Sequence, residues 1–342
     1  MKAVVFHEHG GPEVLRYEDR PDPQIRAHEV LVEVRACALN HLDVWARGGL
    51  PGIEIRLPHV LGNDIAGVVR GVGEIVDWVR PGDEVMLQPG VSCGHCADCL
   101  RGRDNLCAAY DILGYRRDGG YAELVAAPAV NVIPKPGNLS WEEAAALPLV
   151  TVTAWHMLVT RAAVQPGEDV LIHAAGSGVG SIGIQIAKLR GARVIATAGS
   201  DEKLEKAKAL GADETINYSN PDWPREVRRL TGKRGVDVVF EHTGAETWPG
   251  SIQSLAKDGR LVTCGATSGF DARTDIRQVF YRHLSLLGSF MGSKAELLDA
   301  MRFVESGRIR AVVDRALPLA DARRAHELMR DRAQFGKLVL KP

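Results

Sequence analysis

Four of the six cysteines lie close together in one polar, glycine-rich segment, VSCGHCADCLRGRDNLC. Their spacing lets a single turning loop supply three thiolates to a tetrahedral zinc ion, and the fourth thiolate closes the cage. Because four thiolates leave no coordination position for water or substrate, the pattern predicts a structural zinc in a lobe over residues 91–110, with His95 as a bystander. Reduced thiols without a metal are the alternative. The expected ligands are Cys93, Cys96, Cys99 and Cys107.

The segment HAAGSGVGSIG follows a strand-like run and opens a helix-like run. In that context glycines let the backbone approach a pyrophosphate, and the helix N-terminus stabilises its charge. The alternative is a tight turn with no ligand. The expected cofactor-binding residues of this turn are Gly176, Ser177, Gly178, Val179 and Gly180.

The choice between NAD(H) and NADP(H) depends on what ends the second strand, ARVIATA. A carboxylate there would bind the ribose hydroxyls and repel a 2′-phosphate. The strand ends near Ala198, Ser200 follows as an expected helix N-cap, and Lys203 lies one helical turn on, which favours NADP(H). Asp201 keeps NAD(H) open, since it lies about where a ribose-binding acid is sought.

Composition favours two domains and small-molecule partners. The chain has 342 residues, 45% of them hydrophobic, which is enough for two cores. Its 43 acidic and 42 basic residues nearly cancel, so no global charge attracts nucleic acid or an anionic membrane. The apolar run at the N-terminus stops at His7, too early for a secretory signal, and we expect a cytoplasmic protein in which disulfides are disfavoured.

The pattern of expected secondary structure changes along the chain. To about residue 130 it contains short β-type runs broken by glycine and proline, which predicts an all-β domain. From about residue 165 strand-like and helix-like runs alternate, including a helix near 251–259, which predicts a parallel sheet covered on both faces. Two amphipathic segments and the strand-like FGKLVLK end the chain.

The cysteine lobe, the β-rich start and the later glycine turn together resemble the medium-chain dehydrogenase/reductase superfamily of zinc alcohol dehydrogenases and quinone oxidoreductases, over essentially the whole chain. The resemblance implies an α/β plus β fold. Residues 1–130 and 295–342 would form a chaperonin-10-like catalytic domain, and residues 131–294 a Rossmann domain. It also implies a homodimer, or a tetramer.

The resemblance places the usual ligands of a catalytic zinc on three segments, and all three are altered. Asn40 and Asn63 replace a cysteine and a histidine, and Leu149 replaces a second cysteine. Leu42 replaces the hydroxyl that relays the alcohol proton. Without a Lewis acid the oxidation of simple alcohols becomes difficult.

The segment Asn40-His41-Leu42-Asp43 instead is similar to the N-x-x-D segment of quinone oxidoreductases. Trp45 stands where relatives often have tyrosine, so the proton would come from His41 or solvent; His41 is otherwise a pocket-wall residue. The expected catalytic residues are Asn40, His41, Asp43, Asn63 and Thr153. By resemblance, Gly265 and Ser289 lie near the nicotinamide carboxamide, and Lys203, Tyr218 and Arg332 surround a 2′-phosphate.

The sequence therefore predicts an NADPH-dependent reductase of quinones or α,β-unsaturated carbonyls that carries one structural zinc. An alcohol dehydrogenase is the alternative, with an unusual metal site built from Asp64, His41, His59 or Asp43. A non-catalytic nucleotide-binding protein with a structural or regulatory role is the third possibility.

Overall fold

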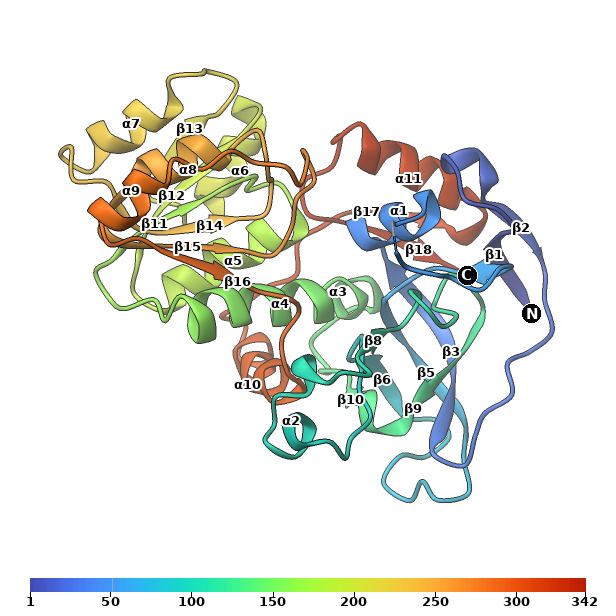
Figure 1. Ribbon diagram of the computed structural model, residues 1–342. Helices are drawn as coiled ribbons and strands as arrows, with labels where there is room; N and C mark the ends of the chain where they lie inside the picture. Colours follow the sequence, from blue (N-terminus) through green and yellow to red (C-terminus); the bar gives the residue numbers. More distant parts are fainter. Residues whose placement is uncertain (51) are drawn as a thin grey trace. The chain divides into compact units, whose positions relative to one another are not determined.

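The computed structural model describes residues 1–50 and 52–342. The chain divides into two compact units (Figure 1). The first comprises Met1–Leu149, Ser293–Leu297 and Ala311–Pro342, and the second comprises Val150–Gly292 and Leu298–Arg310.

The first unit is built mainly from antiparallel strands (Figure 1). Its strands are β1 (Lys2–Phe6), β2 (Arg16–Asp19), β3 (Glu29–Ala38), β4 (His59–Val60), β5 (Asp64–Val72), β6 (Glu84–Leu87), β7 (Gly90–Val91), β8 (Asp111–Ile112), β9 (Leu124–Pro128), β10 (Val132–Pro134), β17 (Val313–Pro318) and β18 (Lys337–Lys341). The main sheet runs β10-β6-β5-β3-β18-β17, with β9 also on β3. Two small sheets, β2-β1-β4 and β7-β8, complete it.

The C-terminal strand β18 lies inside this main sheet. It pairs antiparallel with β3, where Val339 lies opposite Ala38, and parallel with β17. Strand β9 pairs with the earlier part of β3, from Glu29 to Glu33. Besides its long pairing with β5, β3 therefore pairs with β9 through its first residues and with β18 through its last.

In the described part of this unit, these strands are accompanied by α1 (His41–Gly48), α2 (Ala97–Leu100), α3 (Trp141–Ala145) and α11 (Ala322–Arg330). The expectation of an all-β domain missed α1 and α2, which lie in the loops that carry the candidate site residues. The first unit also extends beyond residue 130, because β10 pairs with β6 and α3 packs against β3 and β5.

The second unit contains a six-stranded sheet in which every pairing is parallel. Its strands are β11 (Asp169–Ile172), β12 (Arg193–Ala198), β13 (Glu214–Asn217), β14 (Val236–Glu241), β15 (Leu255–Thr263) and β16 (Ser285–Gly288). The order β13-β12-β11-β14-β15-β16 reverses direction between β11 and β14. This is the doubly wound Rossmann arrangement, and it confirms the α/β expectation; dinucleotides bind at the carboxyl ends of the strands beside that reversal.

Helices cover both faces of this sheet (Figure 1). They are α4 (Pro148–Trp155), which continues into a π-helical turn at His156–Arg161, α5 (Gly178–Leu189), α6 (Asp201–Ala209), α7 (Trp223–Leu230), α8 (Trp248–Ser254) and α9 (Ile276–Tyr281). Helix α10 (Lys294–Glu305) follows them in the sequence, and its first residues belong to the first unit. Trp223 and Val227 of α7 and Ile252 of α8 pack in one core cluster with Leu171 and Val239 of the central strands. The apolar strands are thus buried by amphipathic helices, as the alternating pattern predicted.

One expected helix is shorter than the sequence suggested. The segment 251–259 was expected to be helical, but α8 ends at Ser254 and β15 begins at Leu255. Leu255 pairs with Val236, and the register shifts before the next pair. Asp258 adopts φ +62° there, so tertiary pairing overrides the local helical pattern.

Strand β16 forms one edge of the sheet of the second unit, and three of its four residues are exposed. Among the described residues, none of the helices combines the length and apolarity that crossing a bilayer requires.

Candidate functional site

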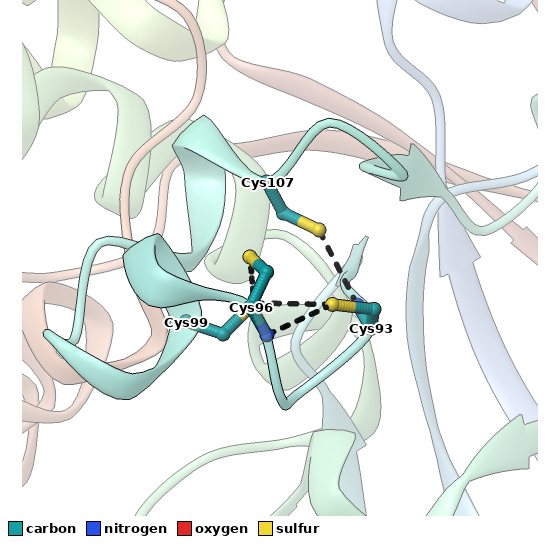
Figure 2. A group of neighbouring side chains, drawn as sticks. All are labelled: Cys93, Cys96, Cys99 and Cys107. Atoms are coloured by element: carbon teal, nitrogen blue, oxygen red, sulfur yellow. Dashed lines mark hydrogen bonds between the residues drawn. The ribbon is translucent and has the colours of Figure 1, made fainter.

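The four cysteines of the lobe converge on one point (Figure 2). All four sulfur atoms lie within 4.8 Å of one another, with Cys93 Sγ 3.9 Å and Cys96 Sγ 3.5 Å from Cys99 Sγ. A tetrahedron with Zn–S bonds of about 2.3 Å has edges of about 3.8 Å. The spacing therefore fits zinc, and with four thiolates the site is closed to substrate.

Backbone groups and a neighbouring helix stabilise the lobe. The Cys96 N–H donates to Cys93 Sγ at 3.4 Å, and the Cys93 N–H donates to Cys107 Sγ at 3.5 Å. Lys294, the first residue of α10, donates its N–H to Asp104 Oδ1 at 2.9 Å. His95 is exposed and contacts the Cys93 carbonyl at 2.8 Å, so it stays outside the sulfur cluster.

Asp43 joins two of the candidate segments in the first unit. Its carboxylate is fully buried and accepts hydrogen bonds from the Asn40 N–H at 2.7 Å and the Gly62 N–H at 3.0 Å. The first of these belongs to a capping box at the start of α1. Burial raises the pKa of Asp43 to about 7, against the opposing effect of these donors. Asp43 thus fixes the backbone that carries Asn40 relative to the backbone that carries Asn63.

The three positions that would hold a catalytic zinc come together around Asp64. The Asn40 Nδ2 donates to Asp64 Oδ2 at 2.9 Å, and the Leu149 N–H donates to Asp64 Oδ1 at 2.7 Å. Asn63 Oδ1 lies 3.5 Å from Asn40 Nδ2, while Asn63 Nδ2 donates to the Leu113 carbonyl at 2.7 Å. The three segments that the sequence aligned with zinc-ligand positions therefore do lie together in space. They present two amides, Asn40 and Asn63, and the aliphatic Leu149.

Lys337, which the sequence pattern did not single out, contacts two of these side chains. It begins β18, is 4% exposed, and donates from Nζ to Asn40 Oδ1 at 2.6 Å and to Asp64 Oδ2 at 2.9 Å. An ammonium has three donors, so these contacts leave one N–H. The available signal was a charged residue directly before the apolar run Leu338–Leu340 of the strand-like FGKLVLK.

A second buried network leads from Asp43 to α11. Arg47 donates to His326 Nδ1 at 2.7 Å, and His326 Nε2 lies 3.1 Å from the Tyr121 hydroxyl, which in turn hydrogen-bonds Asp43. Because Arg47 can only donate, the partners assign the neutral His326 with its proton on Nε2. Burial, and then the charge of Arg47, lower the pKa of His326 to about 3.

His41, the first residue of α1, is partly buried, and its ring lies 6.2 Å from that of Trp45. Within residues 1–50 and 52–342, the four lobe cysteines are the one group of three or more His, Cys, Asp or Glu side chains placed to hold a metal. His41, Asp43, His59 and Asp64 therefore do not assemble the unusual metal site that the alternative required.

The glycine turn of the second unit has the geometry that a phosphate-binding turn needs. Ser177 is the N-cap of α5 and accepts the Gly180 N–H at 2.9 Å. A Cβ on Gly180 would lie 2.5 Å from the Ala174 carbonyl oxygen, so any larger residue would push the helix away from the strand. Gly176, Gly178 and Val179 belong to the same turn at the carboxyl end of β11.

The groups expected around the ribose lie at the neighbouring strand ends. Ala198 ends β12, Ser200 caps α6 by accepting the Lys203 N–H at 3.4 Å, and the Tyr218 N–H donates to the Ala198 carbonyl at 3.1 Å. Asp201 accepts from Asn217 Nδ2 at 3.3 Å. Arg332, which follows α11, belongs to the first unit.

Two buried hydroxyls of the second unit suit an amide-bearing ligand. Thr153 Oγ1 in α4 and Ser289 Oγ after β16 have no hydrogen-bond partner among the described residues. Gly265 follows β15, and Thr263 lies opposite Gly288, so Gly265 and Ser289 both lie at the carboxyl ends of these two parallel strands. Buried polar atoms without partners call for an explanation, and a nicotinamide carboxamide at these strand ends would give Ser289 Oγ a partner.

Two family models match the chain: the alcohol dehydrogenase GroES-like domain over residues 26–137, and the zinc-binding dehydrogenase over residues 178–306. A zinc-type alcohol dehydrogenase-like protein of Schizosaccharomyces pombe is 36% identical, over 100% of this chain and 99% of its own. The chain belongs to the medium-chain dehydrogenase/reductase superfamily. The chaperonin-10-like and Rossmann expectations are thereby confirmed.

Other members of the superfamily are also similar over their full lengths. A crystal structure of an NAD-dependent alcohol dehydrogenase is 55% identical with a TM-score of 0.97, covering 100% of both chains. The quinone oxidoreductase of Salmonella typhimurium is 32% identical over 99% of both chains. This superfamily member is therefore an NAD(P)H-dependent oxidoreductase that acts on a small molecule.

Proposed function

We propose that this oxidoreductase reduces quinones or α,β-unsaturated carbonyl compounds with NADPH and without a catalytic metal. The observation that carries the proposal is the set of groups at the ligand positions. Asn40, Asn63 and Leu149 offer no thiolate or imidazole, and the ammonium of Lys337 lies between Asn40 and Asp64. A cation already fills the electrostatic role at the carboxylate that a zinc ion would otherwise take.

The donor set favours conjugated acceptors. Oxidation of a simple alcohol needs strong stabilisation of an alkoxide, which zinc supplies as a Lewis acid. A quinone or enone spreads the developing negative charge by conjugation, so positioned amide and ammonium donors can suffice. NADPH supplies the hydride when bound; the substrate then takes a proton from His41 or from solvent.

The expected catalytic residues differ in how deeply their side chains are buried. Asn40 and Thr153 are 7% and 5% exposed, His41 is more accessible, and we propose that these three contact substrate or nicotinamide. Asp43 and Asn63 are fully buried and bonded to backbone groups. We propose that Asp43 and Asn63 are positioning residues.

The preference for NADPH rests on the end of β12. Ala198 and Ser200 carry no charge, while Lys203 and Tyr218 belong to the same neighbourhood. An ammonium near the ribose stabilises a 2′-phosphate. Asp201 and the NAD-dependent relative favour the opposite preference, so both cofactors belong in the test.

The deciding experiment is a steady-state screen of quinones, enals and alcohols with NADPH and NADH, together with a zinc determination. The proposal predicts turnover of quinones or enals, weak alcohol oxidation and about one zinc per chain. Two zinc ions per chain with efficient alcohol oxidation would establish the alcohol dehydrogenase alternative. Tight NADPH binding without turnover of any acceptor would indicate a structural or regulatory protein.

We further propose a cytoplasmic homodimer formed by pairing the β16 edges of two second units. The exposed edge strand and the exposed apolar side chains Leu286 and Phe290, at 39% and 58%, support this arrangement. An unpaired apolar edge would otherwise promote aggregation.

A further inference from the structure

A basic cavity of about 850 Å³ opens on the second unit, away from the glycine turn. It lies where β14 and β15 begin, whereas the glycine turn follows the carboxyl end of β11. Because the strands of this sheet are parallel, the starts of β14 and β15 and the end of β11 lie at opposite ends of the strands. The cavity is lined by Pro224, Arg225, Arg228, Arg234, Gln253, Ala256, Lys257, Tyr281 and Arg282.

Five of these nine residues are cationic and none is acidic. Arg225 pairs with Asp222 at 3.5 Å, and Arg234 pairs with Asp169 and Asp237. The other three, Arg228, Lys257 and Arg282, have no carboxylate partner within residues 1–50 and 52–342. The cavity therefore holds positive charge that the described residues leave uncompensated.

Helix capping accounts for only part of this arrangement. At the C-terminal end of α8, Arg282 donates to the Ile252 carbonyl at 3.1 Å and to Leu255. Arg228 donates to the Lys233 carbonyl at 2.6 Å and, more weakly, to the Gln253 carbonyl at 3.5 Å. Carbonyls at a helix C-terminus attract cations, but two guanidiniums placed near each other there also repel. Burial, and then the charge of Arg228, lower the pKa of Arg282. Capping does not explain Lys257, which is exposed and contacts none of these carbonyls.

We propose that the basic cavity binds a small phosphate-bearing molecule at a site separate from the dinucleotide turn. Guanidiniums bind phosphate oxygens in a bidentate manner, and an ammonium adds a point charge. The Tyr281 ring, 74% exposed at the rim, offers a surface on which a base can stack. Free pyrophosphate and a nucleotide share the phosphate chemistry; they differ in their use of Tyr281.

The test is calorimetric titration of pyrophosphate, and separately of ADP, into protein already saturated with its preferred pyridine nucleotide. We expect one binding event per chain for pyrophosphate, weakened by salt. Lys257→Gln should weaken it about tenfold, the equivalent of one charge-assisted contact. Lys257 caps no helix, so this variant should keep the wild-type melting temperature. Arg302→Gln, which removes an exposed charge on α10, is the matched control and should leave binding unchanged.

Arg228→Gln extends the test to a guanidinium, with its melting temperature measured alongside. Tyr281→Leu should weaken the binding of ADP and leave the binding of pyrophosphate unchanged if the ligand is a nucleotide. An ADP affinity that this variant leaves unchanged would assign the site to phosphate groups alone. Absence of pyrophosphate and ADP binding, or binding that Lys257→Gln and Arg228→Gln leave unchanged, would overturn the proposal. The outcome is independent of which substrate the enzyme reduces.

Discussion

The ammonium of Lys337 lies 2.9 Å from the carboxylate of Asp64, and both side chains are almost completely buried. A buried ion pair is costly to form and more costly to break, because removing one partner leaves an uncompensated charge. The pair also holds the Asn40 amide, whose oxygen accepts from Lys337 and whose nitrogen donates to Asp64.

We expect Lys337→Met to lower the free energy of unfolding by about 3 kcal/mol or more, since Asp64 then remains buried and unpaired. The double variant Lys337→Met/Asp64→Asn should recover part of that stability but little of kcat/KM, because Asn40 has lost the ammonium that orients it. Denaturant unfolding and steady-state kinetics on both variants test this. Recovery of activity in parallel with stability would show that the pair has a structural role alone.

Loss of the zinc from the cysteine lobe should lower the stability of the fold and should affect hydride transfer only indirectly. Cys96→Ser or Cys107→Ser should reduce zinc from about one per chain and lower the melting temperature, with indirect effects on hydride transfer. Cys264→Ser is the control, because Cys264 lies outside the sulfur cluster. A fully metallated, stable Cys96→Ser protein that has lost activity would contradict a structural metal.

The pH dependence of stability contains two opposing contributions. The pKa of His326 is lowered by folding, so its stabilising contribution is present above pH 6.5 and is lost as pH falls toward about 3. The pKa of Asp43 is raised to about 7, so its contribution falls as pH rises toward 7. The two partly cancel in the wild type.

The variant His326→Gln separates these contributions, since the amide can accept from Arg47 and donate to Tyr121 without titrating. Between about pH 8 and about pH 5, the stability advantage of wild type over His326→Gln should shrink by about 2 kcal/mol. Chemical denaturation at both pH values measures it. An advantage that is constant or grows on acidification would show that His326 is protonated in the folded state.

Cofactor choice should respond to a carboxylate at the end of β12. Ala198→Asp should shift the ratio of kcat/KM toward NADH by about ten- to a hundredfold, because the carboxylate can bind ribose hydroxyls and repel a 2′-phosphate. Lys203→Ala should shift it the same way by a smaller step. Lys208→Ala, at the far end of α6, is the control. A wild type that already prefers NADH would identify Asp201 as the ribose ligand.

The β16 edge should control assembly. Leu286→Lys places a charge on the exposed apolar edge and should convert the proposed dimer to monomer at micromolar concentration, as measured by sedimentation velocity. Leu298→Lys introduces the same charge at a site on α10 that is 52% exposed and should leave assembly unchanged. A wild type that sediments only as monomer would end the dimer proposal.

The parts of the site that depend on short sequence separations were predictable. The four cysteines lie within fifteen residues, and Ser177 caps the helix that begins at Gly178, so local spacing determines their geometry. The contacts of Lys337 with Asp64 and of Arg47 with His326 span 273 and 279 residues. Such pairs arise only when distant strands and helices pack, and no periodicity in one segment reveals them.

The position of β18 between β3 and β17 sets an order of events during synthesis. The six strands of the second unit all precede residue 289, so that sheet can form while β18 is still inside the ribosome. Until β18 emerges, part of the edge of β3 stays open and Asp64 lacks its counterion. Emergence of β18 therefore both covers this part of β3 and supplies the counterion of Asp64, and a nascent chain stalled before β18 would expose an unpaired strand edge that favours aggregation.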